Sequence, residues 1–225
     1  QAASECPTDP AARGAGGILG DTPVDQARAA TLLFIPGPVR TPRPDLTAYM
    51  ERLPGYSVAL FSPTLGRYSP AQMMLDISQG ARVASSLYKP VTPAPPGLVV
   101  DRTGGGRLQP WQPFVKRAGD VPGEVVPGLL GCALAEAGRS VTWYGFRDSP
   151  TITSIAAANA AGVIPSVGNA DRAQLGERLL DAQHRSDLLV AALPSGGAGL
   201  GVAATLARET PERLILLVQS PPEPA

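Results

Sequence analysis

Short, continuous apolar runs separated by helical patterns constrain this chain more than any other feature of its sequence. The clearest runs are ATLLFIPG (30–37), DLLVAAL (187–193) and ERLILLVQS (212–220). They are apolar throughout rather than alternating with polar residues, which is typical of strands buried on both faces of a parallel sheet. Helical patterns lie between such runs, as in α/β domains. The sequence therefore predicts an α/β fold, with a mostly parallel sheet and helices on both faces.

The rest of the chain extends this pattern into one domain. Further strands are expected at 55–63, 96–101, 140–145 and 163–168. Helices are expected at 44–53, 70–80, 127–138, 153–162, 171–185 and 199–209, with Asp171 as the N-cap of its helix. Residues 1–28 are rich in Ala, Gly, Asp and Pro, which predicts an irregular N-terminal arm. Residues 29–225 then form a single α/β domain, in which the Pro-rich stretch 90–126 is an irregular insertion.

Charge and hydropathy exclude several classes of partner. The 225 residues include 19 basic and 19 acidic side chains, so the net charge is zero. No basic run marks a nucleic-acid surface, and none of the apolar runs approaches the ~20 residues that span a bilayer. The printed chain begins at Gln1 rather than Met, so a removed signal peptide or a membrane anchor outside this chain stays open.

The two cysteines, Cys6 and Cys132, lie far apart in the sequence. In an exported protein they are able to form one disulfide that ties the N-terminal arm to the body of the domain. The alternative is a buried thiol at Cys132 and a free thiol at Cys6. The sequence leaves both open.

A glycine-rich segment follows the strand at 187–193. It includes Ser195 and Gly197 and leads into a helix, a context that suits the binding of an anion or a nucleotide. The glycine spacing departs from G-x-G-x-x-G, and there is no Walker lysine, so a flexible turn is the competing interpretation. A second glycine cluster, TGGGR (103–107), is interpreted as a mobile loop.

Loops at the carboxyl ends of the expected strands are where an α/β sheet binds ligands. Arg40, Arg67 and Arg147 lie in or beside these loops, which favours an anionic ligand. The competing interpretation is that they are ordinary surface cations. The sequence predicts no metal site, because its one histidine, His184, lies on the polar side of a helix and the aspartates form no dense cluster.

The segment RYSPAQMMLDISQG (67–80) contains a candidate nucleophile. Ser69 before Pro70 is a favourable N-cap, with the proline at the first helical position. In many hydrolases a catalytic serine also lies at the start of a helix. A Ser-His-Asp hydrolase is disfavoured, because no G-x-S-x-G segment is present.

Several segments together resemble the alkaline phosphatase superfamily. The stretch 67–80 is similar to its nucleophile segment, 30–37 to its first strand, and 126–145 to its helix–glycine–strand segment. The segment 212–224 resembles the strand before its later metal-binding residues. The resemblance spans most of residues 30–222 and is closest to divergent exported or membrane-linked members from actinobacteria. It implies an alkaline-phosphatase-like core and an extracytoplasmic location.

Departures from the family pattern bear on activity. The family's metal-binding Asp after the first strand is replaced by Ile35, Pro36 and Gly37, and Ser69 lies one residue from the expected nucleophile position. The resemblance therefore implies a degenerate, non-catalytic domain without a cofactor, which binds or supports an unidentified protein or envelope component. The alternative is a phosphoester or sulfate-ester hydrolase with Ser69 as nucleophile, a divalent metal, and Asp76 or Asp101 assisting. A cytosolic nucleotide- or sugar-phosphate-binding protein that uses residues 195–201 is a third hypothesis.

Overall fold

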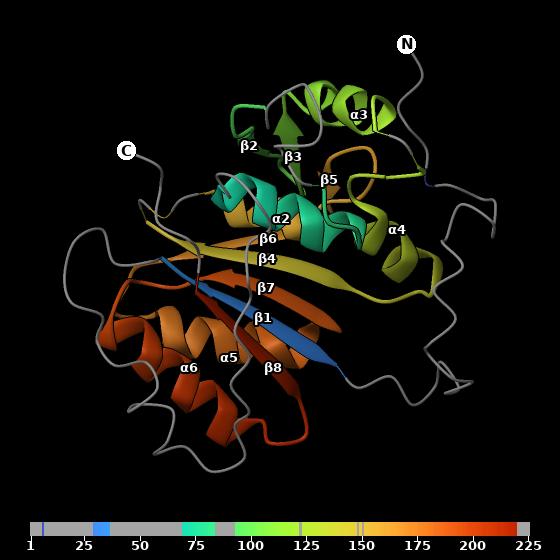
Figure 1. Ribbon diagram of the computed structural model, residues 1–225. Coiled ribbons are helices and arrows are strands. Elements are labelled where there is room, and N and C mark those ends of the chain that lie inside the picture. Colours follow the sequence, from blue (N-terminus) through green and yellow to red (C-terminus); the bar gives the residue numbers. More distant parts are fainter. Residues whose placement is uncertain are drawn as a thin grey trace.

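The computed structural model describes Cys6 and residues 29–36, 69–83, 93–121, 123–147, 149 and 151–219. These residues form a five-stranded parallel sheet in the order β6-β4-β7-β1-β8 (Figure 1). Its strands are β1 (Ala30–Ile35), β4 (Val141–Phe146), β6 (Ser166–Ala170), β7 (Leu188–Ala192) and β8 (Leu214–Gln219). The α/β class predicted from the apolar runs is confirmed. Among the described residues, no helix has the length and apolar character that crossing a bilayer requires.

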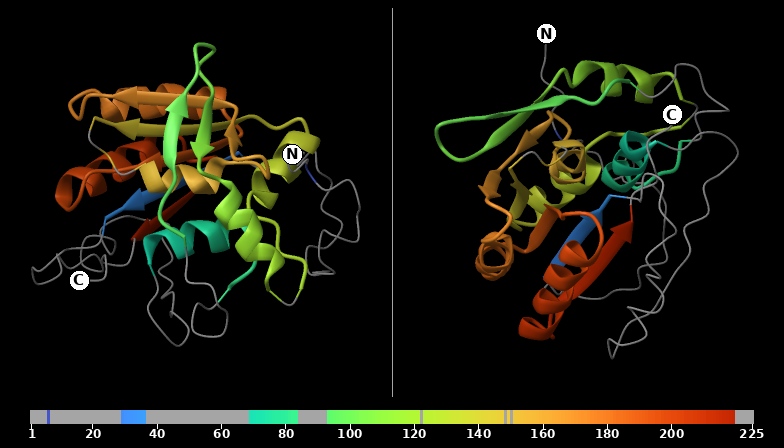
Figure 2. Two further views of the ribbon diagram at one scale, coloured as in Figure 1. Left: turned by 90° about the horizontal axis from the view of Figure 1, so that it is seen from above. Right: turned by 90° about the vertical axis from the view of Figure 1, so that its left-hand side faces the viewer.

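Two long helices, α5 (Leu175–Arg185) and α6 (Gly197–Glu209), cover one face of the sheet (Figures 1 and 2). Because side chains alternate along a strand, Leu33 of β1 and Leu189 of β7 point to this face. They pack there against apolar side chains of both helices, including Leu200. The result is a mainly aliphatic layer built from strand–helix units.

The opposite face is covered by shorter elements. They are α2 (Pro70–Gln79), α3 (Gln112–Gly119), α4 (Leu129–Glu136) and the 3-10 helix η3 (Thr151–Ala157). Phe34 of β1 and Trp143 of β4 belong to the core on this side, together with Met74 of α2. Figure 1 shows α2 running against the direction of the strands, and Figure 2 agrees, so its first turn lies where the strands end.

A small second sheet lies on the same side of the main sheet and shares the core of these helices. It has the order β2-β3-β5, with β2 (Gly97–Val100), β3 (Gly106–Gln109) and β5 (Val163–Ile164) paired antiparallel. The strand expected at 96–101 is observed as β2, but the rest of 90–126 was expected to be irregular, and its described part contains β3 and α3. The cause is the hairpin turn at 101–105, where Asp101 Oδ1 accepts hydrogen bonds from the Thr103 and Gly105 amides.

Two further expectations are corrected by the structure. The glycine cluster TGGGR is part of an ordered hairpin, and the Gly104 carbonyl accepts a 2.7 Å hydrogen bond from the Val167 amide of β6. The expected strand at 163–168 is divided into β5, in the small sheet, and β6, at the edge of the large one. Pro165 lies between them and has no amide hydrogen to donate to a ladder.

Helix boundaries agree with the sequence where glycine or proline sets them. The helix at 70–80 is observed as α2, which Pro70 begins and Gly80 ends in the left-handed conformation at φ 65°. Asp171 is not the N-cap of α5, because the helix begins at Leu175, where Gln174 is the cap position. The predicted helix at 44–53 and strand at 55–63 lie outside the described residues.

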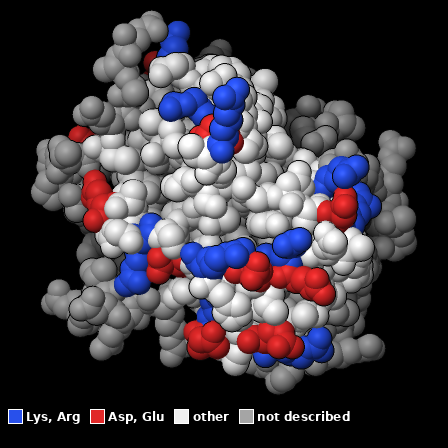
Figure 3. Space-filling view, turned by 180° about the vertical axis from the view of Figure 1, so that it is seen from behind, with Lys and Arg blue, Asp and Glu red and all other residues white. Residues whose placement is uncertain are grey.

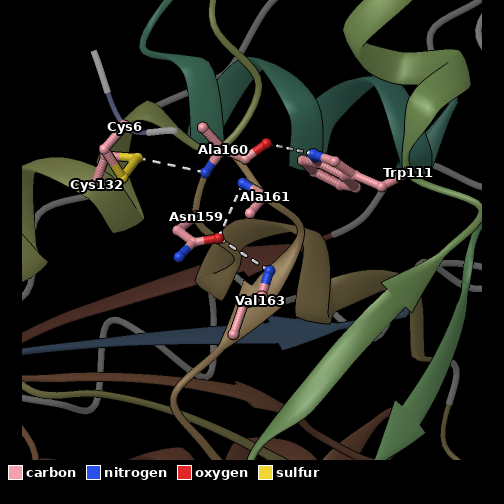
Figure 4. Close-up of a disulfide and its surroundings, with 7 residues drawn as sticks. All are labelled: Cys6, Trp111, Cys132, Asn159, Ala160, Ala161 and Val163. Atoms are coloured by element: carbon pink, nitrogen blue, oxygen red, sulfur yellow. Dashed lines mark hydrogen bonds between the residues drawn. A yellow bond between two sulfur atoms is a disulfide. The ribbon is translucent and has the colours of Figure 1, made fainter. Parts of the chain in front are cut away.

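A disulfide joins Cys6 to Cys132 in α4, with a Cα–Cα distance of 5.5 Å (Figure 4). The Cys132 sulfur also accepts a 3.4 Å hydrogen bond from the Ala160 amide, and the Ala160 carbonyl accepts one from the Trp111 indole. The disulfide therefore contacts the segment 159–163, which hydrogen bonds to the Trp111 indole and the Asn159 side chain hold in place. Of the two outcomes that the sequence left open, the structure contains the disulfide.

Candidate functional site

The carboxyl ends of β4 and β7 mark the position where an open α/β sheet is expected to bind a ligand. The two strands are neighbours, but the connection after β4 runs through η3 on one face and that after β7 runs through α6 on the other. Open α/β sheets bind ligands at such a reversal. We call the residues at this edge, Arg147, Ser149, Ser195 and Gly197, the switch-point site.

The start of α6 forms one side of this site. Gly196 takes φ 69° before the helix, a conformation that side-chain-bearing residues rarely adopt, and no side chain caps the first turn. A Cβ at Gly199 would lie 2.1 Å from the Pro194 carbonyl oxygen, so only glycine fits where the loop folds back on the helix. Ser195 and Gly197 are exposed. The amide groups of this turn are of the kind that binds small anions.

Arginines form the other side of the site. Arg147 makes an ion pair with Asp171 at 3.2 Å, and their side chains are 76% and 61% exposed. Arg172, which follows Asp171 in the sequence, places its guanidinium 5.0 Å from the centre of the Phe146 ring. An exposed pair of this kind contributes at most about 1 kcal/mol to stability, so Arg147 is able to exchange Asp171 for another anion.

Charge on the face opposite to the view of Figure 1 is mixed. Basic and acidic side chains lie next to each other there rather than in separate areas (Figure 3). A surface of this kind has no extended field of one sign to attract a highly charged polymer. In the switch-point site, the charge of Arg147 is likewise balanced locally, by Asp171.

Ser69 lies at the start of α2, on the opposite face of the sheet from α6. Its Oγ accepts a 3.2 Å hydrogen bond from the Gln72 amide, and Pro70 occupies the first turn. The interpretation of Ser69 as a helix cap is confirmed. A nucleophile would need a base to accept its proton, and the described contacts of Ser69 supply a backbone amide donor instead.

The two aspartates considered as helpers of Ser69 have other hydrogen-bond partners. Asp76 is buried in α2, about 10 Å along the helix axis from Ser69, and its Oδ1 accepts hydrogen bonds from Gln72, Gln79 and the Val83 amide. Asp101 lies in the β2–β3 turn, where hydrogen bonds from the Thr103 hydroxyl and amide hold its pKa below the ordinary value. Neither carboxylate is placed to act on the Ser69 hydroxyl.

The other sequence-based candidates divide into two groups. Arg40 and Arg67, expected at the carboxyl-end loops, lie outside the described residues. His184 is exposed in the last turn of α5, as its place on the polar side of the helix suggested. Within the part of the chain that the structure describes, no three His, Cys, Asp or Glu residues are grouped closely enough to hold a metal ion.

Sequence reasoning missed the partners that complete the switch-point site. Asp171 was assigned to a helix cap, and nothing in the sequence links it to Arg147 across two strands. Ser149 Oγ accepts a 3.2 Å hydrogen bond from the Phe146 amide and shapes the loop after β4. The parallel pairing of β4 with β6 is what brings Arg147 and Asp171 together, and one sequence carries no signal for it.

Three comparisons complete the description of the site. No family model matches the chain, and neither a curated protein nor a solved structure resembles it closely enough to count as a match.

Proposed function

We propose that this chain is a non-catalytic α/β domain of an extracytoplasmic protein, which binds or supports another component of the cell envelope. Its core is of the alkaline-phosphatase-like kind, with the catalytic chemistry lost. The switch-point site is its binding edge, where a small anionic group of the partner or ligand contacts Arg147 and the first turn of α6.

The observation that carries this proposal is the structural use of the groups that a hydrolase would need. The Ser69 hydroxyl oxygen accepts a hydrogen bond from the Gln72 amide. The Asp76 carboxylate is buried in α2 and accepts three hydrogen bonds. Ester hydrolysis by a serine requires that oxygen to be deprotonated and directed at the substrate. The described surroundings of Ser69 favour its role as a cap.

The disulfide supports the location. Bonds between cysteines persist in secreted and envelope proteins and are rare where thiols are kept reduced. Cys132 is 1% exposed and bonded to Cys6, which ties the N-terminal segment to α4. A cytosolic nucleotide-binding protein has no evident use for such a tether. Thiol labelling of denatured protein isolated from its native host, without reductant, is expected to detect no free cysteine.

The proposal is tested by assaying the purified chain on phosphomonoesters, phosphodiesters and sulfate esters, with metal content measured on the same sample. No turnover is expected, with or without added zinc, manganese, magnesium or calcium. Two variants interpret the result. Ser69→Ala removes the cap and is expected to cost about 1 kcal/mol of stability, whereas Ser69→Asp keeps a capping oxygen and is expected to cost little.

The competing function is a metal-dependent phosphoester or sulfate-ester hydrolase with Ser69 as nucleophile. The position of Ser69 at the start of a ten-residue helix, on the side where the strands end, is the observation in its favour. Turnover that Ser69→Asp abolishes while the fold stays intact would establish the hydrolase and overturn the non-catalytic proposal. If the wild type shows no turnover and the two Ser69 variants differ only in stability, Ser69 acts as a helix cap and not as a nucleophile.

A further inference from the structure

The β2–β3 hairpin projects beyond the rest of the described chain in both views of Figure 2. Among the described residues, four large aliphatic side chains are exposed, and two of them, Val99 and Val100, are neighbours in β2. Each of these valines is 53% exposed. Single exposed apolar residues are ordinary, but an adjacent pair on a projecting element is a candidate contact surface.

The two valines lie on opposite faces of the hairpin. Val99 is opposite Arg107 of β3, on the outer face. Val100 is opposite Gly106, where a Cβ would lie 2.8 Å from a side-chain atom of Val167, so this face is turned toward the main sheet. A flat protein surface would cover only one of these faces. A lipid headgroup layer is fluid and is able to surround the hairpin on both.

The charges beside the valines are mainly basic. Arg102 in the turn and Arg107 on β3 are exposed. Asp101 is the one acidic residue within 97–109, and its Oδ1 is directed into the turn, where it accepts hydrogen bonds from the Thr103 amide and hydroxyl. Guanidinium groups pair with phosphate oxygens, so this end of the hairpin is complementary in charge to an anionic lipid surface.

We propose that the hairpin tip, residues 99–107, docks on an anionic lipid surface. Val99 and Val100 enter the headgroup layer, and Arg102 and Arg107 contact lipid phosphates. Apolar and basic side chains act together in peripheral contacts of this kind, and neither set is sufficient alone. The hairpin tip shares no residue with the switch-point site, and the ester-hydrolysis assays do not bear on it.

The backbone of β2 limits the depth of this contact. The Asp101 amide donates to the Gly105 carbonyl, which fixes the direction of alternate groups along the strand. The amides of Leu98 and Val100 consequently point away from β3. They would lose their hydrogen bonds with water in the hydrocarbon core of a bilayer, whereas the headgroup layer stays hydrated. The hairpin tip therefore rests among the headgroups.

Flotation of the intact protein with lipid vesicles tests the proposal. Vesicles of equal parts phosphatidylglycerol and phosphatidylcholine are expected to bind the protein at least about 10-fold more strongly than phosphatidylcholine vesicles do. Added salt is expected to weaken the binding, because it screens exposed charges. The double variant Arg102→Gln with Arg107→Gln is expected to bind the anionic vesicles about 10-fold more weakly. Arg208→Gln, at an exposed arginine of α6, is the control and leaves binding unchanged.

A second double variant tests the apolar contribution. Val99→Ser with Val100→Ser is expected to weaken binding to the anionic vesicles about 10-fold, because the loss of apolar side chains removes the insertion. Leu214→Ser, at a leucine 52% exposed on β8, is the control and leaves binding unchanged. In bicelles of the same anionic mixture that contain a spin-labelled lipid, the wild-type amide signals of 99–104 are expected to broaden, and that of Leu189 is not.

Three results decide the matter. Binding that needs anionic lipid, falls in both double variants and broadens the hairpin signals establishes the proposal. No binding, or binding that both double variants leave unchanged, overturns it. A dimeric mass without vesicle binding, with slowed hydrogen exchange at the Leu98 and Val100 amides, assigns the edge of β2 to a second copy of the chain and overturns it as well. If a double variant unfolds, the lipid dependence and the broadening in the wild type decide alone.

Discussion

The two faces of the main sheet are constructed differently. On one face, α5 and α6 lie over β1 and β7, and the core between them is mostly leucine, isoleucine and alanine. On the other face, four shorter helical elements and a hairpin meet the sheet, and the core contains both tryptophans of the chain, Trp111 and Trp143. The first layer is a repeat of strand–helix units, whereas the second is assembled from unlike pieces.

The second face also contains individual polar bonds. Arg117 of α3 donates a 2.6 Å hydrogen bond to Gln72 of α2, which in turn donates to Asp76. Both tryptophan indoles donate to fixed acceptors, Trp143 to the Thr153 hydroxyl and Trp111 to the Ala160 carbonyl. Aliphatic packing is non-directional, but each of these contacts has one correct geometry. Specific polar contacts occur on the α5–α6 face as well, where Gln183 of α5 donates a 2.8 Å hydrogen bond to the Thr31 hydroxyl of β1.

The largest expected effect comes from removing the tether of the irregular face. Cys6→Ser opens a loop whose ends are 126 residues apart, and chain entropy predicts a loss of about 4 to 5 kcal/mol in the free energy of unfolding. Urea unfolding checks the loss. Reductant should lower the wild type to the same level and leave Cys6→Ser unchanged. A loss below about 1 kcal/mol would mean that the irregular face is held without help from the disulfide.

The next effect concerns the buried polar chain between α3 and α2. Arg117 is 3% exposed, and burial lowers the pKa of its guanidinium while the charge of Asp76 opposes this shift. Arg117→Met should cost about 3 kcal/mol, because Gln72 loses a hydrogen-bond donor and Asp76 loses a nearby positive charge while both stay buried. The matched control is Arg107→Met on β3, where the side chain is exposed and the change should stay within about 0.5 kcal/mol. Equal effects in the two variants would contradict the specific role of the network.

The smallest effect concerns the junction where β4 and β7 begin. Two hydrogen bonds from Ser140, and a third from Arg139, hold the pKa of Asp187 below its ordinary value of 3.8. A depressed pKa means that the stabilisation is present above the ordinary pKa and is lost as the pH falls through the folded-state value. The stability difference between wild type and Asp187→Asn, measured by urea unfolding, should therefore shrink below about pH 4.

A surface pair provides the control for that titration. Asp181 and Arg185, spaced i,i+4 on α5, are 55% and 69% exposed. Asp181→Asn is expected to change stability by no more than about 0.5 kcal/mol over the same pH range. A pH response as large as that of Asp187→Asn would show that general surface charge, rather than the Ser140 contacts, sets the acid sensitivity.

The sequence predicts the regular face well and the irregular face less well. The runs at 30–37, 187–193 and 212–220 contain β1, β7 and β8, because solid apolar strands have few alternatives in a chain of this size. On the irregular face, β2 lies in the strand predicted at 96–101, but β3 and the pairing into a small antiparallel sheet were missed. Its hairpin depends on the side chain of Asp101 bonding its own turn, and β5 pairs with β3 across many intervening residues. Secondary-structure propensity depends on residues that are close in the sequence, so it does not predict a pairing between distant strands.

The candidate site is divided in the same way. Ser195 and Gly197 were placed correctly at the start of a helix, because strand–glycine–helix order is visible in a sequence. The pairing of Arg147 with Asp171 depends on β6 lying beside β4, and the sequence predicted strands there without their order. The cap at Ser69 was visible because Ser-Pro has a local preference.

The hydrogen bond between the Gly104 carbonyl and the Val167 amide has a consequence for how copies of this protein meet. β6 is an edge strand of the large sheet, and an exposed edge strand can pair with a strand of another molecule and so promote aggregation. The hairpin turn accepts a hydrogen bond from one of the outward-facing amides of β6, and it leaves less room for a strand of another molecule to pair along this edge. The hairpin thus makes polymerisation through the β6 edge less favourable. The chain uses three consecutive glycines, Gly104 to Gly106, to bring the hairpin to this position.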